Sequence, residues 1–167
     1  MTGAPTGPAV STPAPQGPAP LSSEPFRPRL ARYVTLAIGA VVAVLTVVIV
    51  VALPRLGPEG GGVLDRGGFA LVGVAIVWFC WRQASVAAVP DADGLTVRNL
   101  VVTRRLEWAE IVSVRFGSGR PWVQLDLADG DTLAVMGVQR ADGERADAEA
   151  RRLATLVAFH TRTERDD

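Results

Sequence analysis

A run of twenty residues without a charged side chain, from Val34 to Leu53, constrains this chain more than any other feature. At about 1.5 Å per residue, a helix of this length reaches roughly 30 Å, the thickness of the hydrocarbon core of a bilayer. Its side-chain polar groups are the hydroxyls of Thr35 and Thr46, which in a helix can bond to carbonyls of the preceding turn. The run is longer than the apolar part of a signal peptide. We therefore expect a transmembrane helix over residues 33–53.

A second apolar segment, from Gly67 to Trp81, is only fifteen residues long. As a helix it would measure about 22 Å, so a buried core helix is the alternative to a membrane crossing. However, no charged side chain interrupts any face of the segment. Trp78 and Trp81, followed by Arg82, are typical of residues at the membrane interface. We expect a second transmembrane helix over residues 67–85.

The connection over residues 54–66 is rich in Gly and Pro, and it predicts a helical hairpin with both termini on the same side. Val63 and Leu64 would lengthen the second span if Asp65 and Arg66 pair or reach the interface. Arginine is more frequent outside the hairpin than in the connection, which holds Arg55 and Arg66. The outer arginines are Arg27, Arg29, Arg32, Arg82, Arg98, Arg104 and Arg105. The positive-inside rule therefore predicts a multi-pass protein of the bacterial plasma membrane with both termini in the cytoplasm.

The composition excludes several kinds of catalysis. All 17 basic residues are arginine, so no P-loop, Schiff-base or kinase-type lysine is present. The single cysteine, Cys80, lies in the second span, and the single histidine, His160, lies near the C-terminus. No cluster has metal-ligand spacing, and no nucleophile or dinucleotide motif occurs. We therefore expect no catalytic residue, metal, cofactor or small-molecule substrate, and no enzymatic activity.

The N-terminal part has the composition of a disordered tail. Residues 1–28 hold eight of the 12 prolines and have little apolar surface, so we assign residues 1–32 to a disordered cytoplasmic tail. Residues 86–167 contain eleven arginines and fourteen acidic residues, a net charge of −3. An acidic domain of this kind is a poor candidate for binding nucleic acid.

From residue 86 the pattern changes to short alternating segments separated by turns, which is typical of an antiparallel meander. The expected strands cover residues 85–89, 95–99, 101–106, 111–116, 122–127 and 132–136. A helix follows, with Asp142 as its expected N-cap and an apolar stripe that includes Ala146, Leu153 and Val157. We expect this domain to cover residues 86–160, with a charged tail over 161–167. The fold class is α+β, with the helix covering the apolar face of the sheet.

Three segments carry a resemblance to a known family. They are GLTVRN at 94–99, RRLEWAEI at 104–111 and LDLADG at 125–130, followed by the Ala-rich helix. Together they resemble the bacterial pleckstrin-homology (PH) domains, most closely those of small antigen-like membrane proteins of high-GC Gram-positive bacteria. The resemblance implies a PH-like half-open barrel with one C-terminal helix and no known enzymatic activity. It also implies that Trp108 is a core or edge anchor and not a ligand contact.

The resemblance does not extend to lipid binding, because the turn over residues 90–94 contains two aspartates and no basic residue. Arg98, Arg104 and Arg105 are the candidate contacts for an anionic lipid or a partner; the alternative is a solvated strand face. We expect a non-catalytic interaction module that holds a protein-binding domain at the cytoplasmic face of the membrane. Its partner would be an unidentified membrane or membrane-associated protein. The alternative is a structural subunit whose hairpin packs with partner helices through small residues such as Gly39 and Gly73.

Overall fold

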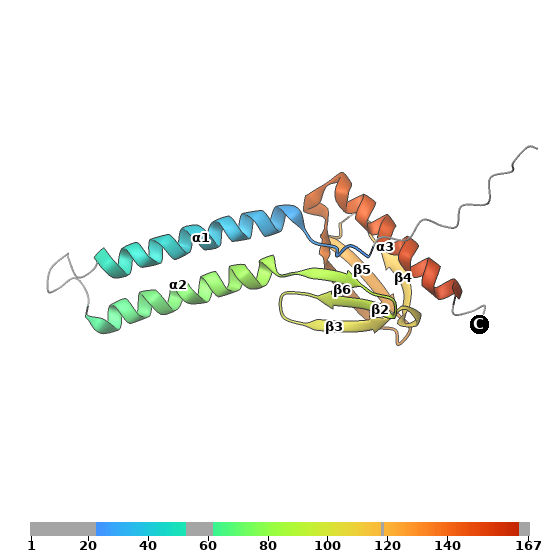
Figure 1. Cartoon of the computed structure of the whole chain (residues 1–167), viewed down its shortest axis with the longest axis horizontal. Coiled ribbons are helices and arrows are strands. Elements are labelled where there is room, and N and C mark those ends of the chain that lie inside the picture. The colour runs from blue at the N-terminus through green and yellow to red at the C-terminus, as the bar shows by residue number, and fades with distance from the viewer. Residues whose placement is uncertain (1–22, 53–61, 118, 164–167) are drawn as a thin grey trace, which may run out of the picture.

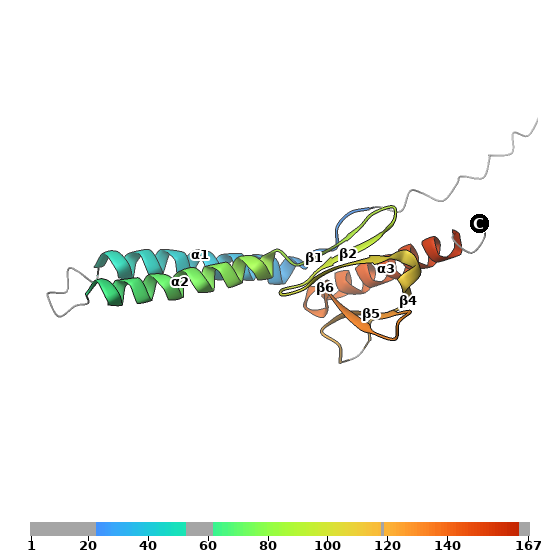
Figure 2. The same cartoon turned by 90° about the horizontal axis from the view of Figure 1, so that it is seen from below.

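Two long helices project from one end of a small α+β domain (Figure 1). In this computed structural model the described residues are 23–52, 62–117 and 119–163. The helices are α1 (Arg29–Ala52) and α2 (Val63–Ala84), which lie side by side as an antiparallel pair. The view from below shows the same arrangement, with the sheets and α3 beyond the end of the pair (Figure 2).

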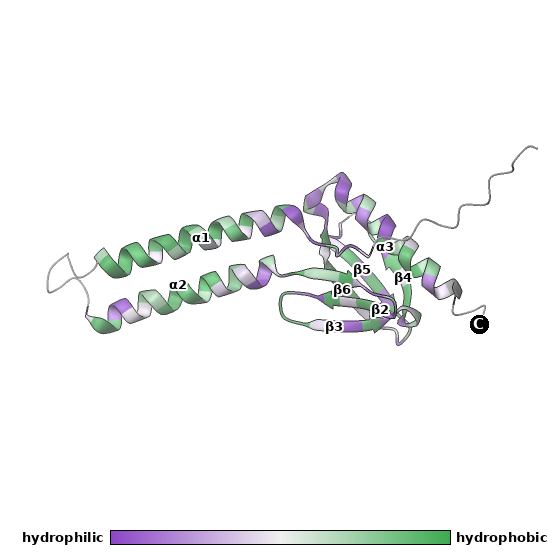
Figure 3. Cartoon of the chain, viewed as in Figure 1, coloured by the Kyte–Doolittle hydropathy of each residue, from purple (hydrophilic) through white to green (hydrophobic). Residues whose placement is uncertain are grey.

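Both helices are long and apolar enough to span a membrane. Figure 3 shows hydrophobic residues along most of α1 and α2, with hydrophilic residues where the helices meet the domain. The hydroxyls of Thr35 and Thr46 donate to the carbonyls of Ala31 and Val42, at 2.7 Å and 2.8 Å, as expected for threonine in an apolar helix. Most large apolar side chains of the pair are exposed, including Leu71, so α2 is not a buried core helix.

The second helix begins at Val63, inside the range 54–66 that was expected to be a loop. The reason is a helix cap: the Asp65 carboxylate accepts a hydrogen bond from the Gly62 N–H at 3.0 Å. Asp65 therefore closes the first turn of α2, a role that the charge pattern did not indicate. The rest of that expected loop, residues 54–61, lies outside the described residues.

Small residues allow α1 and α2 to approach closely. A Cβ atom on Gly73 would lie 2.1 Å from Thr46 Oγ1, so only glycine fits at this crossing. A Cβ on Gly39 would lie 3.1 Å from the Cβ of Cys80, which is buried against α1. Gly39 and Gly73, expected in the alternative interpretation to pack against partner helices, are thus used inside the hairpin itself.

The domain contains two antiparallel sheets of three strands each. The first has the order β1-β2-β3, formed by Ala87–Pro90, Gly94–Arg98 and Thr103–Glu107. The second has the order β4-β5-β6, formed by Ile111–Arg115, Trp122–Leu127 and Thr132–Gln139. Short 3-10 turns precede β4 (Trp108–Glu110) and the last helix (Arg140–Asp142). The helix α3 (Glu144–Thr163) packs on the sheets, so the expected α+β fold with one C-terminal helix is confirmed.

One apolar core joins the sheets and α3. Leu95, Leu125 and Leu153 are completely buried in it. Trp108 is also buried, and its Nε1–H donates to the Asp91 carbonyl at 3.1 Å. The His160 ring stacks on Trp108 with a centroid distance of 4.5 Å. Of the two roles that the resemblance implied for Trp108, a core or an edge anchor, the structure shows the core anchor.

Asn99 connects the two sheets. Its Nδ2 group donates to the Ala134 carbonyl at 2.7 Å, and its Oδ1 accepts from the Met136 N–H at 3.1 Å. A side-chain amide thus takes the place of a neighbouring strand along part of β6. The Asn99 N–H also donates to the Val102 carbonyl at 2.9 Å, in the turn between β2 and β3.

The segment before α1 belongs to the domain. Residues 1–32 were expected to be disordered, but Phe26 is 1% exposed in the domain core. Its N–H and C=O both pair with the backbone of Ala88 in β1, at 2.8 Å and 2.9 Å. Burial of one phenylalanine contributes roughly 1.5–3 kcal/mol, which offsets the ordering of a short segment. At the other end, α3 continues to Thr163, beyond the expected boundary at residue 160, and residues 164–167 lie outside the described part.

Candidate functional site

Asp142 joins the domain to the first long helix. Its two carboxylate oxygens accept hydrogen bonds from the backbone N–H groups of Arg29 and Leu30, each at 2.9 Å. These N–H groups belong to the first turn of α1, where a helix has no internal acceptors for them. Asp142 was expected to cap α3, but the chain turns at Gly143, with φ +61°, before α3 begins. The carboxylate therefore caps α1, about 110 residues away in the sequence.

Three further contacts tie the helices to the domain. Gly137 in β6 lies against the segment around Phe26: a Cβ on this glycine would be 2.8 Å from the Phe26 carbonyl oxygen. The Arg152 guanidinium lies over the Phe26 ring, 3.9 Å from its centroid. At the end of α2, Arg82 Nη2 donates to the Leu100 carbonyl in the β2–β3 turn at 2.6 Å. The segment before α1 and the end of α2 are therefore both held to the domain by specific contacts.

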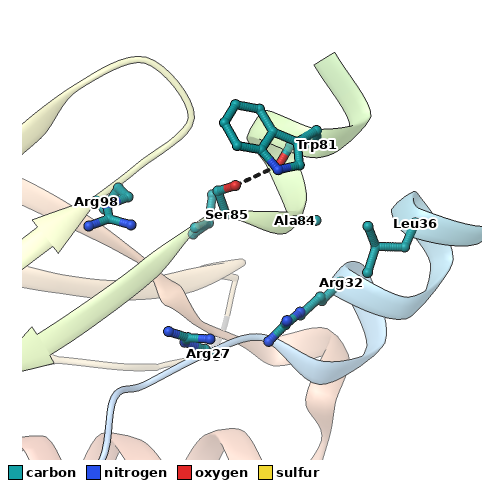
Figure 4. Close-up of a pocket in the computed structure, with 8 residues that line it drawn as sticks. Arg27, Arg32, Leu36, Trp81, Ala84, Ser85 and Arg98 are labelled. Carbon is teal, nitrogen blue, oxygen red and sulfur yellow. Dashed lines mark hydrogen bonds between the residues drawn. The ribbon is translucent and has the colours of Figure 1, made fainter. Parts of the chain in front are cut away.

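A cavity of about 230 Å³ lies where the two helices meet the domain (Figure 4). Its walls come from the start of α1, the end of α2 and the end of β2. The lining residues are Arg27, Arg32, Leu36, Trp81, Ala84, Ser85, Val86 and Arg98. We call this cavity the junction pocket. Its lining contains three arginines, one tryptophan and no acidic residue.

The three arginines of the junction pocket differ from the other arginines of the domain in their partners. Among the residues that the structure describes, no hydrogen bond or ion pair involves the side chain of Arg27, Arg32 or Arg98. Arg32 is half-buried, whereas Arg27 and Arg98 are exposed. The Ser85 hydroxyl donates a hydrogen bond to the Trp81 carbonyl at 2.7 Å. The pocket therefore presents guanidinium groups that are suited to an anion.

The other two candidate arginines lie elsewhere and are paired. Arg104 contacts Asp129 at 3.2 Å and Asp131 at 3.7 Å, in the β5–β6 turn. Arg105 contacts Asp91 at 3.2 Å and Asp93 at 3.7 Å, in the β1–β2 turn. The pKa of Asp129 is lowered, mainly by a hydrogen bond from the Asp131 N–H and also by Arg104. The structure thus separates Arg98 from Arg104 and Arg105.

A further acidic side chain on the sheet surface, Asp126, also pairs within the domain. Asp126 accepts a hydrogen bond from the Ser113 hydroxyl and forms an ion pair with Arg115 across β4 and β5. The Ser113 hydroxyl and then the Arg115 guanidinium lower the pKa of Asp126. This cluster stabilises a strand pair and leaves no free charge for a ligand.

Sequence reasoning did not group Arg27 and Arg32 with Arg98. Arg27 and Arg32 were recognised as positive charge next to the membrane, and that was the available signal. Their approach to Arg98 depends on the threading of Phe26 into the domain and on the Asp142 cap, neither of which has a local pattern in the sequence.

Comparisons with known proteins agree with this architecture. Residues 86–155 match the family model described as a bacterial PH domain. The chain is 40% identical over 65 residues to uncharacterized protein Rv1417 of Mycobacterium tuberculosis and to uncharacterized protein Mb1452 of Mycobacterium bovis. Each match covers 39% of this chain and 42% of the relative, so the chain spans about two fifths of the length of these relatives. No solved structure matches the chain significantly.

The family match covers all six strands and most of α3, the elements that surround Trp108. It excludes Phe26 and both long helices, which the structure attaches to one end of the matched segment. Residues 86–155 of this chain therefore match the bacterial PH domain family, and they follow two helices that are long and apolar enough to span a membrane.

Proposed function

We propose that this chain is a non-catalytic interaction module anchored in the bacterial plasma membrane. The two helices cross the membrane and hold the PH domain at the cytoplasmic face, where the domain binds a membrane protein or a membrane-associated protein. The observation that carries this proposal is the junction, in which Asp142 of the domain caps α1 and Phe26 is buried in the domain core. A domain joined to its anchor in this way keeps one orientation towards the membrane surface.

The exposed surface of the helices supports the membrane anchor. Val44, Val47 and Leu71 are more than half exposed, and similar side chains surround both helices. A soluble monomer rarely exposes an apolar surface of this extent. The hydroxyls of Thr35 and Thr46 in the apolar part of α1 both donate to backbone carbonyls of the preceding turn, so neither is left unsatisfied in an apolar surrounding.

The charge distribution supports the cytoplasmic location. Arg27, Arg29 and Arg32 lie at the domain end of α1, and Arg82 lies at the domain end of α2. By the positive-inside rule, this end of the hairpin remains in the cytoplasm. The PH domain, which follows α2 directly, is then on the same side.

The nature of the domain supports interaction in place of catalysis. PH domains generally act as interaction modules, and residues 86–155 match this family. On the domain surface, Arg104, Arg105 and Arg115 form ion pairs with aspartates of neighbouring turns and strands, so these charges serve the fold. Confinement at the membrane raises the effective concentration of the domain near membrane-bound partners, which favours binding even at modest affinity.

A helix exchange tests the proposal. Residues 36–79 are replaced by an unrelated two-helix hairpin, while the segment from Phe26 to Arg32 and the end of α2 are kept. A photo-crosslinking amino acid at the exposed position Val112 of the domain then captures neighbours in cells, and the products are identified by mass. We expect the same partner with the native and the foreign hairpin. Capture that depends on the native hairpin would instead support the alternative, a subunit whose helices are the binding element.

A further inference from the structure

We propose that the junction pocket binds the phosphate of an anionic phospholipid, and that one acyl chain of this lipid lies in an apolar groove between α1 and α2. The inference goes beyond the proposed function, because it concerns the lipid of the leaflet next to the domain and requires no protein partner.

The headgroup part of the site consists of arginine and tryptophan. Arg27, Arg32 and Arg98 line a cavity of about 230 Å³ without an acidic neighbour in the lining. Guanidinium groups bind phosphate oxygens through paired N–H donors, and they do so without losing their charge. The indole of Trp81 forms another wall, and tryptophan is enriched at the headgroup level of membranes.

The chain part of the site is a second cavity of about 410 Å³ on the side of the hairpin. It is lined by Ala43, Thr46, Val47, Gly73, Val74, Val77, Trp78 and Trp81. Thr46 is the one residue in this lining with a side-chain hydroxyl, and that hydroxyl is satisfied by the Val42 carbonyl at 2.8 Å. Trp81 lines both cavities, so the groove begins where the junction pocket ends.

The depths of the two cavities match one leaflet. From Trp81 to Gly73 the chain covers eight residues of α2, which is a rise of about 12 Å. Half the thickness of the hydrocarbon core is about 15 Å. The groove therefore extends over the depth of the acyl chains in the leaflet that faces the domain, while the arginines lie at the level of the phosphates.

The end of the domain that carries Arg98 is also suited to the bilayer surface. The β2–β3 turn exposes Val101 by 81% and Val102 by 56%, and Arg82 ties this turn to the end of α2. Figure 1 shows the turn between β2 and β3 at the helix end of the domain. Apolar side chains beside arginines that form no ion pair within the described part of the chain favour an anionic lipid over a free anion, which would not use the groove.

The experiment measures lipid binding by native mass spectrometry of the full chain in detergent. The probes are dioleoylphosphatidylglycerol, dioleoylphosphatidylcholine and glycerol 3-phosphate. The test variant replaces Arg27, Arg32 and Arg98 by Gln. The control variant replaces Arg104, Arg105 and Arg115 by Gln, which removes the same charge from arginines that are paired with aspartates.

We expect one phosphatidylglycerol per chain, with at least tenfold preference over phosphatidylcholine and no competition by glycerol 3-phosphate. The test variant should lose on the order of 100-fold in affinity, from three basic residues near the lipid surface, and the control variant less than threefold. If the test variant does not fold, the single change Arg98→Gln decides, with an expected loss of several-fold.

A groove variant tests the position of the acyl chain. Ala43→Phe fills the groove and should weaken phosphatidylglycerol binding about tenfold, whereas Ala37→Phe, at an exposed position outside both linings, should not. Equal binding of glycerol 3-phosphate, equal losses in the test and control variants, or a dimer that excludes lipid from the groove would each overturn the proposal. None of these results bears on protein binding by the PH domain, so the two proposals fail separately.

Discussion

Replacement of Asp142 by alanine should loosen the PH-like domain from α1. The half-buried Asp142 carboxylate accepts the N–H groups of Arg29 and Leu30, each at 2.9 Å, and it lies at the positive end of the helix dipole. Alanine has no acceptor, so both N–H groups lose their partner. The fold of each part should persist, because the Phe26 side chain and the sheet core are unchanged.

The magnitude follows from known helix caps. Loss of a capping side chain costs about 0.5–2 kcal/mol, and the charge of Asp142 and its two accepted hydrogen bonds place it in the upper half of that range. A change of about 1–2 kcal/mol in local opening corresponds to about 5–30-fold faster exchange of the two amide hydrogens. The change should be confined to the first turn of α1.

Hydrogen exchange of the full chain in lipid nanodiscs, followed by mass spectrometry, measures this effect. The peptide that contains residues 26–32 should exchange faster in Asp142→Ala, while peptides from β5 should not change. Asp147→Ala is the matched control, because Asp147 is an exposed carboxylate in the first turn of α3. Unchanged exchange in the Asp142 variant would show that the cap does not hold α1, and the reasoning about the junction would be wrong.

Three further results are expected. Gly137→Val forces β6 away from the Phe26 carbonyl and should destabilise the domain by about 1–3 kcal/mol in thermal unfolding. Gly117→Val, at a site with open space, should be nearly neutral. Equal effects of the two changes would contradict the close approach of Gly137 to the Phe26 carbonyl. Ser113→Ala removes the main cause of the lowered pKa of Asp126. The lowered pKa stabilises the fold above pH 3.8, and this stabilisation is lost as the pH falls through the folded-state pKa, so the difference in melting temperature between wild type and variant should narrow below pH 3.8. A difference that grows below pH 3.8 would refute this assignment. Reporter fusions after residue 61 and after residue 167 should report the outside and the cytoplasm, and a cytoplasmic signal from the first fusion would overturn the topology.

The parts of the fold that the sequence predicted well are those with a strong local pattern. The charge-free run of α1 and the alternation in β5 each determine one kind of structure, and both helices and all six strands lie close to their expected positions. The segment resemblance predicted Trp108 as a core or edge anchor, and the structure shows that it is buried in the core. The start of α2 was placed too late because the capping role of Asp65 is visible only once the helix is known to extend to it.

The junction was not predicted, since its contacts join residues that are far apart in the chain. Phe26 lies in a Pro-rich segment whose composition is typical of disorder, and a single aromatic residue there gives no periodic signal. Asp142 has the position of an N-cap for α3, and nothing local shows that its carboxylate turns to α1 instead. The grouping of Arg98 with Arg27 and Arg32 depends on both contacts, so the candidate site was found only in part.

The most direct test of the account is a distance measurement between the helices and the domain in a bilayer. Spin labels at Val44 in α1 and Val101 in the β2–β3 turn, both exposed, are introduced in a Cys80→Ala background. Double electron–electron resonance in nanodiscs should give one narrow distance distribution, because the domain is fixed to its anchor. A broad distribution in the wild type would mean that the domain moves freely on its helices. A narrow distribution that Asp142→Ala combined with Phe26→Ala leaves unchanged would mean that these two contacts do not fix the domain. Either result would contradict the account.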